Sequence, residues 1–197
     1  MQDLALEPTP PGWLDAVFAD FDAFLKDHAS CEKKASGMAL NIAAHYPDQP
    51  DLVAAMADLA VEELGHYREV IRLLIERDIT PGPDRKDPYV RALNDVIRRG
   101  PAFFLLDRLL MAAIIERRGN ERFGLIAAGL ADGALPGGER LAAFYRAITA
   151  SEDRHWQLFL DLAERHCRTE EIAPRLAELI VLEGELMLAQ PFHAALH

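Results

Sequence analysis

Two stretches of this 197-residue chain place a carboxylate and an imidazole three residues apart. VEELGHYREV contains Glu63 and His66, and ASEDRHWQLF contains Glu152 and His155. Helical residues at this spacing lie about 60° apart around the axis, so both side chains can reach the same space. Each pair can therefore offer two donor atoms to one metal ion, and the recurrence favours two pairs that act together.

Two further glutamates meet the charge requirement of a dimetal site, which needs additional carboxylates and oxygens that can bridge two ions. Glu32 lies in DHASCEKKASG, where small residues stand one turn away, and Glu116 follows the apolar run FFLLDRLLMAAII. Either glutamate alone could be a surface residue beside its basic neighbours, and a single Glu-x-x-His is usually a solvated pair. Their occurrence together, with one glutamate or one Glu-x-x-His on each of four long helices, favours a metal site. We predict that the metal ligands are Glu32, Glu63, His66, Glu116, Glu152 and His155.

The elements that must position these residues are helices, because apolar residues follow helical periodicity and strand-like alternation is nearly absent. Pro and Gly cluster between the periodic segments. We predict a single domain spanning residues 1–197, with Asp51 as an N-cap and Pro101 in a first helical turn. The predicted bundle helices cover about 13–45, 51–78, 101–131 and 139–167, with shorter helices at 89–99 and 173–188.

The charge and the cysteine content of the chain limit the classes of protein to which it can belong. The net charge of −11 argues against broad, nonspecific binding to nucleic acid. Residues 65–122 nevertheless carry 12 basic and 9 acidic side chains, against 9 and 23 in the remainder. The two cysteines imply no disulfide framework, and no signal peptide or membrane span is apparent. We therefore expect a cytoplasmic protein.

The predicted order of ligands matches a known arrangement, that of the ferritin-like di-iron and di-manganese carboxylate proteins. Their metals are held by one Glu from each of two helices and a Glu-x-x-His from each of the other two. Oxygen-rich ligation with one histidine per metal suits iron or manganese better than structural zinc. The predicted fold class is therefore all-α, a ferritin-like four-helix bundle with a crossover connection and two additional helices.

Four segments carry a closer resemblance. DHASCEKKASGMALN, LAVEELGHYREV, IIERRGNERF and SEDRHWQLF resemble the corresponding segments of the tRNA hydroxylases known as MiaE, and the resemblance runs from about Trp13 to the last helix. It implies an O2-dependent non-haem di-iron monooxygenase that hydroxylates the isopentenyl group of 2-methylthio-N6-isopentenyladenosine in tRNA. The implied cofactors are two iron ions, with dioxygen as co-substrate and an external electron donor.

The resemblance also implies partners. A tRNA anticodon stem-loop would be held through its phosphates by basic side chains, and an unidentified protein would deliver electrons. We expect no membrane partner, and a monomer or small homo-oligomer. The candidate phosphate contacts are Arg68, Arg72, Arg98, Arg99, Arg117, Arg118 and Arg122, although most basic residues on helices are simply solvated.

Three alternatives remain open on sequence alone. The chain could be a di-iron oxidase or oxygenase that acts on a small molecule. It could instead be an iron-handling protein without an organic substrate, in which case storage predicts a large closed assembly. It could also be a bundle that has kept its ligands but lost its activity.

Overall fold

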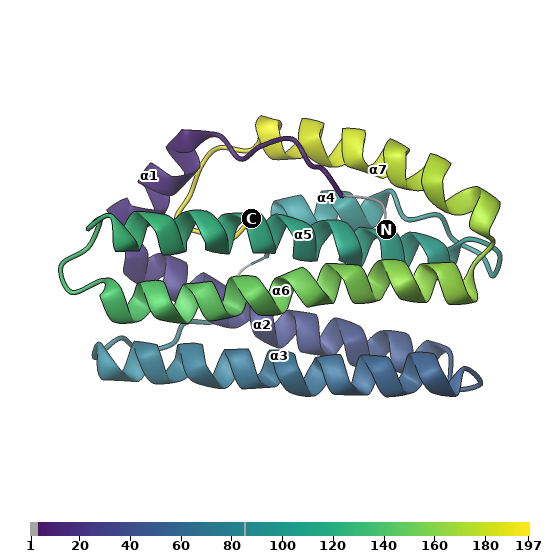
Figure 1. Cartoon of the computed structure of the whole chain (residues 1–197), viewed down its shortest axis with the longest axis horizontal. Helices are drawn as coiled ribbons and strands as arrows, with labels where there is room; N and C mark the ends of the chain where they lie inside the picture. The colour runs from purple at the N-terminus through teal and green to yellow at the C-terminus, as the bar shows by residue number, and fades with distance from the viewer. Residues whose placement is uncertain (1–3, 85) are drawn as a thin grey trace. The chain divides into compact units, whose positions relative to one another are not determined.

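Helices make up all the regular secondary structure of residues 4–84 and 86–197, the part of the chain that the computed structural model describes. The helices are α1 (Pro11–Ala19), α2 (Phe21–His45), α3 (Pro50–Glu76), α4 (Pro88–Asp95), α5 (Phe104–Ala131), α6 (Glu139–His166) and α7 (Thr169–Ala189) (Figure 1). The predicted all-α class is confirmed for these residues. None of these helices is both long and apolar enough to cross a membrane.

The chain divides into two compact units. One comprises residues 16–85 and 193–196 and contains α2 and α3; we call it the α2–α3 unit. The other comprises residues 1–15, 86–192 and 197 and contains α4 to α7; we call it the α5–α6 unit. Each unit pairs two long helices, so each can be described by itself.

In the α2–α3 unit, α2 and α3 pack side by side after a short connection (Figure 1). The buried residues of α3 recur at helical spacing, as expected of an amphipathic helix, except between Glu63 and Val70, where no residue is fully buried. Pro50 occupies the first turn of α3, where its missing N–H costs nothing. Gln49 is the N-cap, so the prediction of Asp51 as the cap is wrong. Asp51 lies in the first turn, where its charge complements the helix dipole.

The predicted first helix, 13–45, is in fact two helices. The backbone leaves helical geometry at Asp20, which has φ −145° and ψ 67°. The Asp20 side chain accepts a hydrogen bond of 3.0 Å from the backbone N–H of Ala23 and so caps α2. Continuous apolar periodicity concealed this break, because a cap changes the backbone of one residue without disturbing the pattern on either side.

In the α5–α6 unit, α5 packs along α6, and α7 packs on α5 (Figure 1). Helix α5 begins at Phe104, so the placement of Pro101 in its first turn is wrong; residues 101–103 form a turn instead. The connection to α6 contains Gly133 and Gly137, whose φ angles are +88° and +67°. Both angles are left-handed and favour glycine, which lets the chain reverse within a few residues.

Buried charges tie α7 to the start of α5. The carboxylate of Asp107 is fully buried and lies 2.7 Å from guanidinium nitrogens of both Arg98 and Arg175. Burial raises the pKa of Asp107, but the hydrogen bonds from the two arginines outweigh burial and hold the pKa below its ordinary value. Asp107 is therefore a charged anchor rather than part of the apolar core.

Replacing Asp107 with asparagine is expected to lower the free energy of unfolding at pH 7 by about 2–3 kcal/mol, because hydrogen bonds to a buried charge are lost. The wild-type contribution is complete above the ordinary aspartate pKa of about 3.9 and decreases as the pH falls through the lower folded-state pKa. Urea unfolding at several pH values should therefore show a flatter acid dependence in the variant. Equal acid slopes would contradict this, and Asp95→Asn, at an exposed position, is the control.

Candidate metal centre

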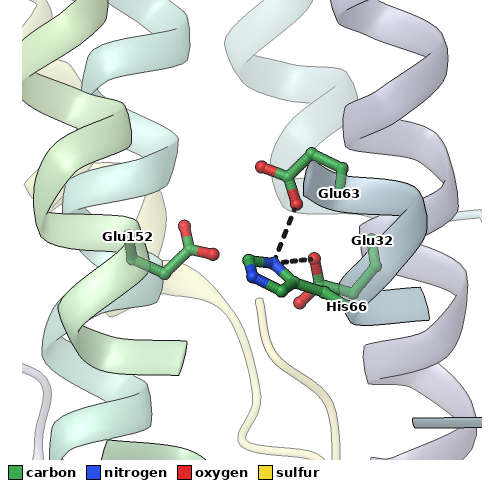
Figure 2. A group of neighbouring side chains, drawn as sticks. All are labelled: Glu32, Glu63, His66 and Glu152. Atoms are coloured by element: carbon green, nitrogen blue, oxygen red, sulfur yellow. Dashed lines mark ion pairs between the residues drawn. The ribbon is translucent and has the colours of Figure 1, made fainter. Parts of the chain in front are cut away.

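The α2–α3 unit brings together three of the predicted ligands. The Nδ1 atom of His66 lies 3.5 Å from Oε2 of Glu32 and 3.4 Å from Oε2 of Glu63 (Figure 2). Both carboxylates are buried, and His66 is 14% exposed. Glu32 comes from α2, whereas Glu63 and His66 come from successive turns of α3. These three residues form the first half-site.

The α5–α6 unit brings together the other three. The Nδ1 atom of His155 lies 3.7 Å from Oε1 of Glu152 and 4.0 Å from Oε2 of Glu116. All three side chains are buried. Glu116 comes from α5, and Glu152 with His155 comes from α6. These residues form the second half-site, which repeats the donor pattern of the first.

One hydrogen bond in each unit sets the register of the paired helices. Ser36 Oγ donates to the carbonyl oxygen of Ala60 at 2.9 Å, and Asn120 Nδ2 donates to the carbonyl oxygen of Thr149 at 2.7 Å. The donor stands four residues after the single glutamate, and the acceptor stands three residues before the glutamate of Glu-x-x-His. The two bonds are therefore equivalent, and each holds a glutamate level with the pair on the neighbouring helix.

The surroundings of Glu32 in the first half-site favour the charged form of its carboxylate. Burial raises the pKa of Glu32, but the charge and hydrogen bond of His28 and hydrogen bonding within the site outweigh burial and hold this pKa well below its usual range. Burial lowers the pKa of His66, but hydrogen bonds with Glu32 and Glu63 raise it to about 9. Without a metal ion, His66 therefore carries a proton that an ion would have to displace.

The donor sets fit metal ions. Within each half-site, one possible ligand atom from each of the three residues lies within 4.8 Å of the others. Two donors about 2.1 Å from a common ion are separated by about 3.0–3.4 Å at octahedral or tetrahedral angles, close to the distances around His66. Buried carboxylates require a compensating charge or donor, which a cation supplies. Carboxylate oxygens with one imidazole per half-site suit iron or manganese.

His28, which is not among the six predicted ligands, contacts one of them. In the structure its Nε2 lies 2.5 Å from Oε1 of Glu32. The spacing of four residues on one helix is the signal that could have identified this contact. In the other unit, Ser151 Oγ lies 3.4 Å from Nε2 of His155.

The seven arginines predicted to contact RNA phosphates differ in their exposure to solvent. Arg68, Arg72 and Arg99 are exposed, and Arg98, although partly exposed, binds Asp107. Arg117 is half-buried and donates to the carbonyl oxygen of Leu4. The prediction is wrong for Arg118 and Arg122, which are buried: Arg118 binds Glu183, and the Arg122 guanidinium lies 4.8 Å from the Trp13 ring centroid. Burial removes both side chains from contact with RNA phosphates.

A glutamate facing a Glu-x-x-His, repeated in two helix pairs, is typical of the ferritin-like carboxylate proteins. A solved structure agrees with this class: "Protein 43 with aldehyde deformylating oxygenase activity from Synechococcus" matches with a TM-score of 0.89 and 32% identity, over 100% of this chain and 96% of that one. The predicted ferritin-like fold class is confirmed.

The chain belongs to the tRNA-(MS[2]IO[6]A)-hydroxylase (MiaE) family, whose model matches residues 1–197. Two relatives are each named tRNA 2-(methylsulfanyl)-N(6)-isopentenyladenosine(37) hydroxylase. The protein of Pseudomonas putida is 36% identical over 173 residues, which are 88% of this chain and 80% of the relative. The protein of Salmonella typhimurium is 30% identical over 138 residues, which are 70% of this chain but only 48% of the relative. The predicted family is confirmed.

Proposed function

We propose that this protein is an O2-dependent di-iron monooxygenase that hydroxylates the isopentenyl group of 2-methylthio-N6-isopentenyladenosine in tRNA. The observation that carries the proposal is the family match over the whole chain, in a protein whose two helix pairs each hold a buried glutamate and Glu-x-x-His. Family membership and the names of both relatives support a tRNA hydroxylase and do not favour the small-molecule or iron-handling alternatives.

The two half-sites would act as one centre within a single domain, with two iron ions held by the six predicted ligands. When bound, the irons would supply the reduction of dioxygen and the oxidation of an allylic C–H bond of the isopentenyl group. The protein's part is to hold the donors. The Ser36 and Asn120 hydrogen bonds keep each glutamate level with its Glu-x-x-His, and burial of the carboxylates keeps water from competing for the ions.

Substrate and electrons would reach the site from outside. The tRNA anticodon stem-loop would be held through phosphates, with Arg68, Arg72 and Arg99 as the accessible candidates among the seven predicted arginines. Electrons would come from a separate donor protein. A tRNA substrate places the reaction in the cytoplasm, and we propose a monomer or small homo-oligomer there.

Mass spectrometry of the modified nucleoside tests this function. Iron-loaded protein, a chemical reductant and ¹⁸O2 are incubated with tRNA that carries 2-methylthio-N6-isopentenyladenosine. We expect a product nucleoside containing one ¹⁸O atom, and no label when ¹⁸O is supplied as water. A parallel deletion of the gene, in a host that makes the hydroxylated nucleoside, should remove that nucleoside from bulk tRNA.

The same preparation distinguishes the alternatives. Unlabelled tRNA, together with uptake of many irons per chain and elution as a large closed assembly, would establish iron storage instead. If the deletion strain retains a normal level of the hydroxylated nucleoside, the tRNA assignment fails. Restoration by the wild-type gene but not by a His155→Ala variant would tie the nucleoside to the second half-site.

A further inference from the structure

His28 distinguishes the first half-site from the second. Its side chain is fully buried in α2, one turn before Glu32, and its Nε2 lies 2.5 Å from Oε1 of Glu32. An ionised carboxylate can only accept hydrogen bonds, so the imidazole Nε2–H donates to Glu32. A hydrogen bond to a charged acceptor is of the strong, charge-assisted kind.

The contact gives the two oxygens of Glu32 different surroundings. Oε1 is engaged by His28, whereas Oε2 faces Nδ1 of His66 at 3.5 Å. The bond to His28 occupies one acceptor direction of Oε1, so Oε2 is the oxygen that is directed at the half-site. Glu32 is therefore prepared to offer one oxygen in a fixed direction.

The second half-site has no histidine four residues before its single glutamate. The residue four before Glu116 is Ala112, which is buried and whose methyl group donates no hydrogen bond. The helix register is equivalent in the two units, as the hydrogen bonds of Ser36 and Asn120 show, so Ala112 stands at the position that corresponds to His28. The two half-sites therefore share ligand types and register, and they differ in the residue one turn before the single glutamate, which is His28 in the first and Ala112 in the second.

We propose that His28 is a positioning residue that restricts Glu32 to one-oxygen ligation and thereby makes the ion held by the α2–α3 unit inequivalent to the ion held by the α5–α6 unit. The inference rests on the proposed metal site. Outer hydrogen-bond partners of metal ligands typically contribute 10–100-fold to metal affinity. The effect of removing His28 should fall on one ion and leave the other unchanged.

Anaerobic titration with ⁵⁷Fe(II), followed by Mössbauer spectroscopy, tests the inference on the whole chain. Wild-type protein should bind two irons that give two distinct quadrupole doublets. In His28→Ala, one iron should bind about 10–100-fold more weakly with an altered doublet, while the second doublet and its affinity persist. His28→Gln, whose amide can donate to Glu32, should restore part of the affinity. His45→Ala, an exposed histidine of the same helix, is the matched control.

The outcomes separate the two proposals. Two irons in the wild type with unchanged affinities and doublets in His28→Ala would overturn the role of His28 but keep the metal site. Equal weakening of both irons would overturn the inequivalence. Fewer than two irons in correctly folded wild-type protein would instead overturn the proposed site itself. Circular dichroism establishes folding, and if His28→Ala fails to fold, His28→Gln carries the test through its altered doublet.

Discussion

Replacing either Glu63 or Glu116 with alanine is expected to reduce hydroxylation by more than about 100-fold and to lower bound iron below two per chain. Removing a ligand should cost more than the 10–100-fold typical of its outer partners. Glu63 belongs to the first half-site and Glu116 to the second, so the pair also tests whether both units serve one centre. Iron per chain is measured by elemental analysis and hydroxylation by nucleoside mass spectrometry.

The control for this experiment is Glu62→Ala, which removes a half-buried carboxylate beside Glu63 on a different side of α3. It should retain two irons and near wild-type hydroxylation. Full iron content and activity in Glu116→Ala would remove that residue from the site. Loss of activity in Glu63→Ala alone would mean that the first half-site works without the second, contrary to a shared centre.

The Arg118→Ala variant is expected to lose about 3–5 kcal/mol of unfolding free energy, the range for breaking a buried ion pair by removing one partner. Arg118 binds both carboxylate oxygens of Glu183, at 2.8 and 2.9 Å, and both side chains are fully buried. Tyr89 donates a third hydrogen bond to Glu183 at 2.7 Å. Without Arg118, the Glu183 charge would be left in a dry interior with only part of its compensation.

Chemical denaturation measures this loss, and Arg91→Ala, at an exposed position on α4, should change stability by less than about 0.5 kcal/mol. The double variant Arg118→Met, Glu183→Met should recover part of the loss, since apolar side chains of similar volume can replace a buried pair. If Arg118→Ala is as stable as Arg91→Ala, the pair does not hold α7 to α5. If the double variant is less stable than Arg118→Ala, the polar network itself is needed.

Arg118 shows where sequence reasoning is weakest. It was a candidate phosphate contact because the resemblance to tRNA hydroxylases implies basic side chains on RNA phosphates, yet its partner Glu183 is 65 residues away in the sequence. Similarly, Glu121 accepts hydrogen bonds from Thr9, which is 112 residues away. Whether a charged helical residue is solvated or paired in the interior depends on which distant residue reaches it, and periodicity carries no such information.

The break at Asp20 illustrates a second limit. Apolar periodicity continues across it, so the pattern predicts one helix, while the cap depends on a single backbone geometry and one side-chain hydrogen bond. The starts of α5 and α7 differ from the predicted ones for a related reason: the first few residues of a helix contribute little to the periodic signal. Existence and type of the long helices follow from many residues and were predicted correctly.

The sequence by itself determined the helical class and the six candidate donors, because a spacing of three residues on a helix is local and converts directly into a shared face. Only the tertiary structure decided that Glu32 lies beside His66 in one unit and that Glu116 lies beside His155 in the other. It also decided that the side chains of Ser36 and Asn120 reach the neighbouring helix and hold each pair of helices in register. These are contacts of individual atoms between or along packed helices, and their geometry exists only once the helices have packed.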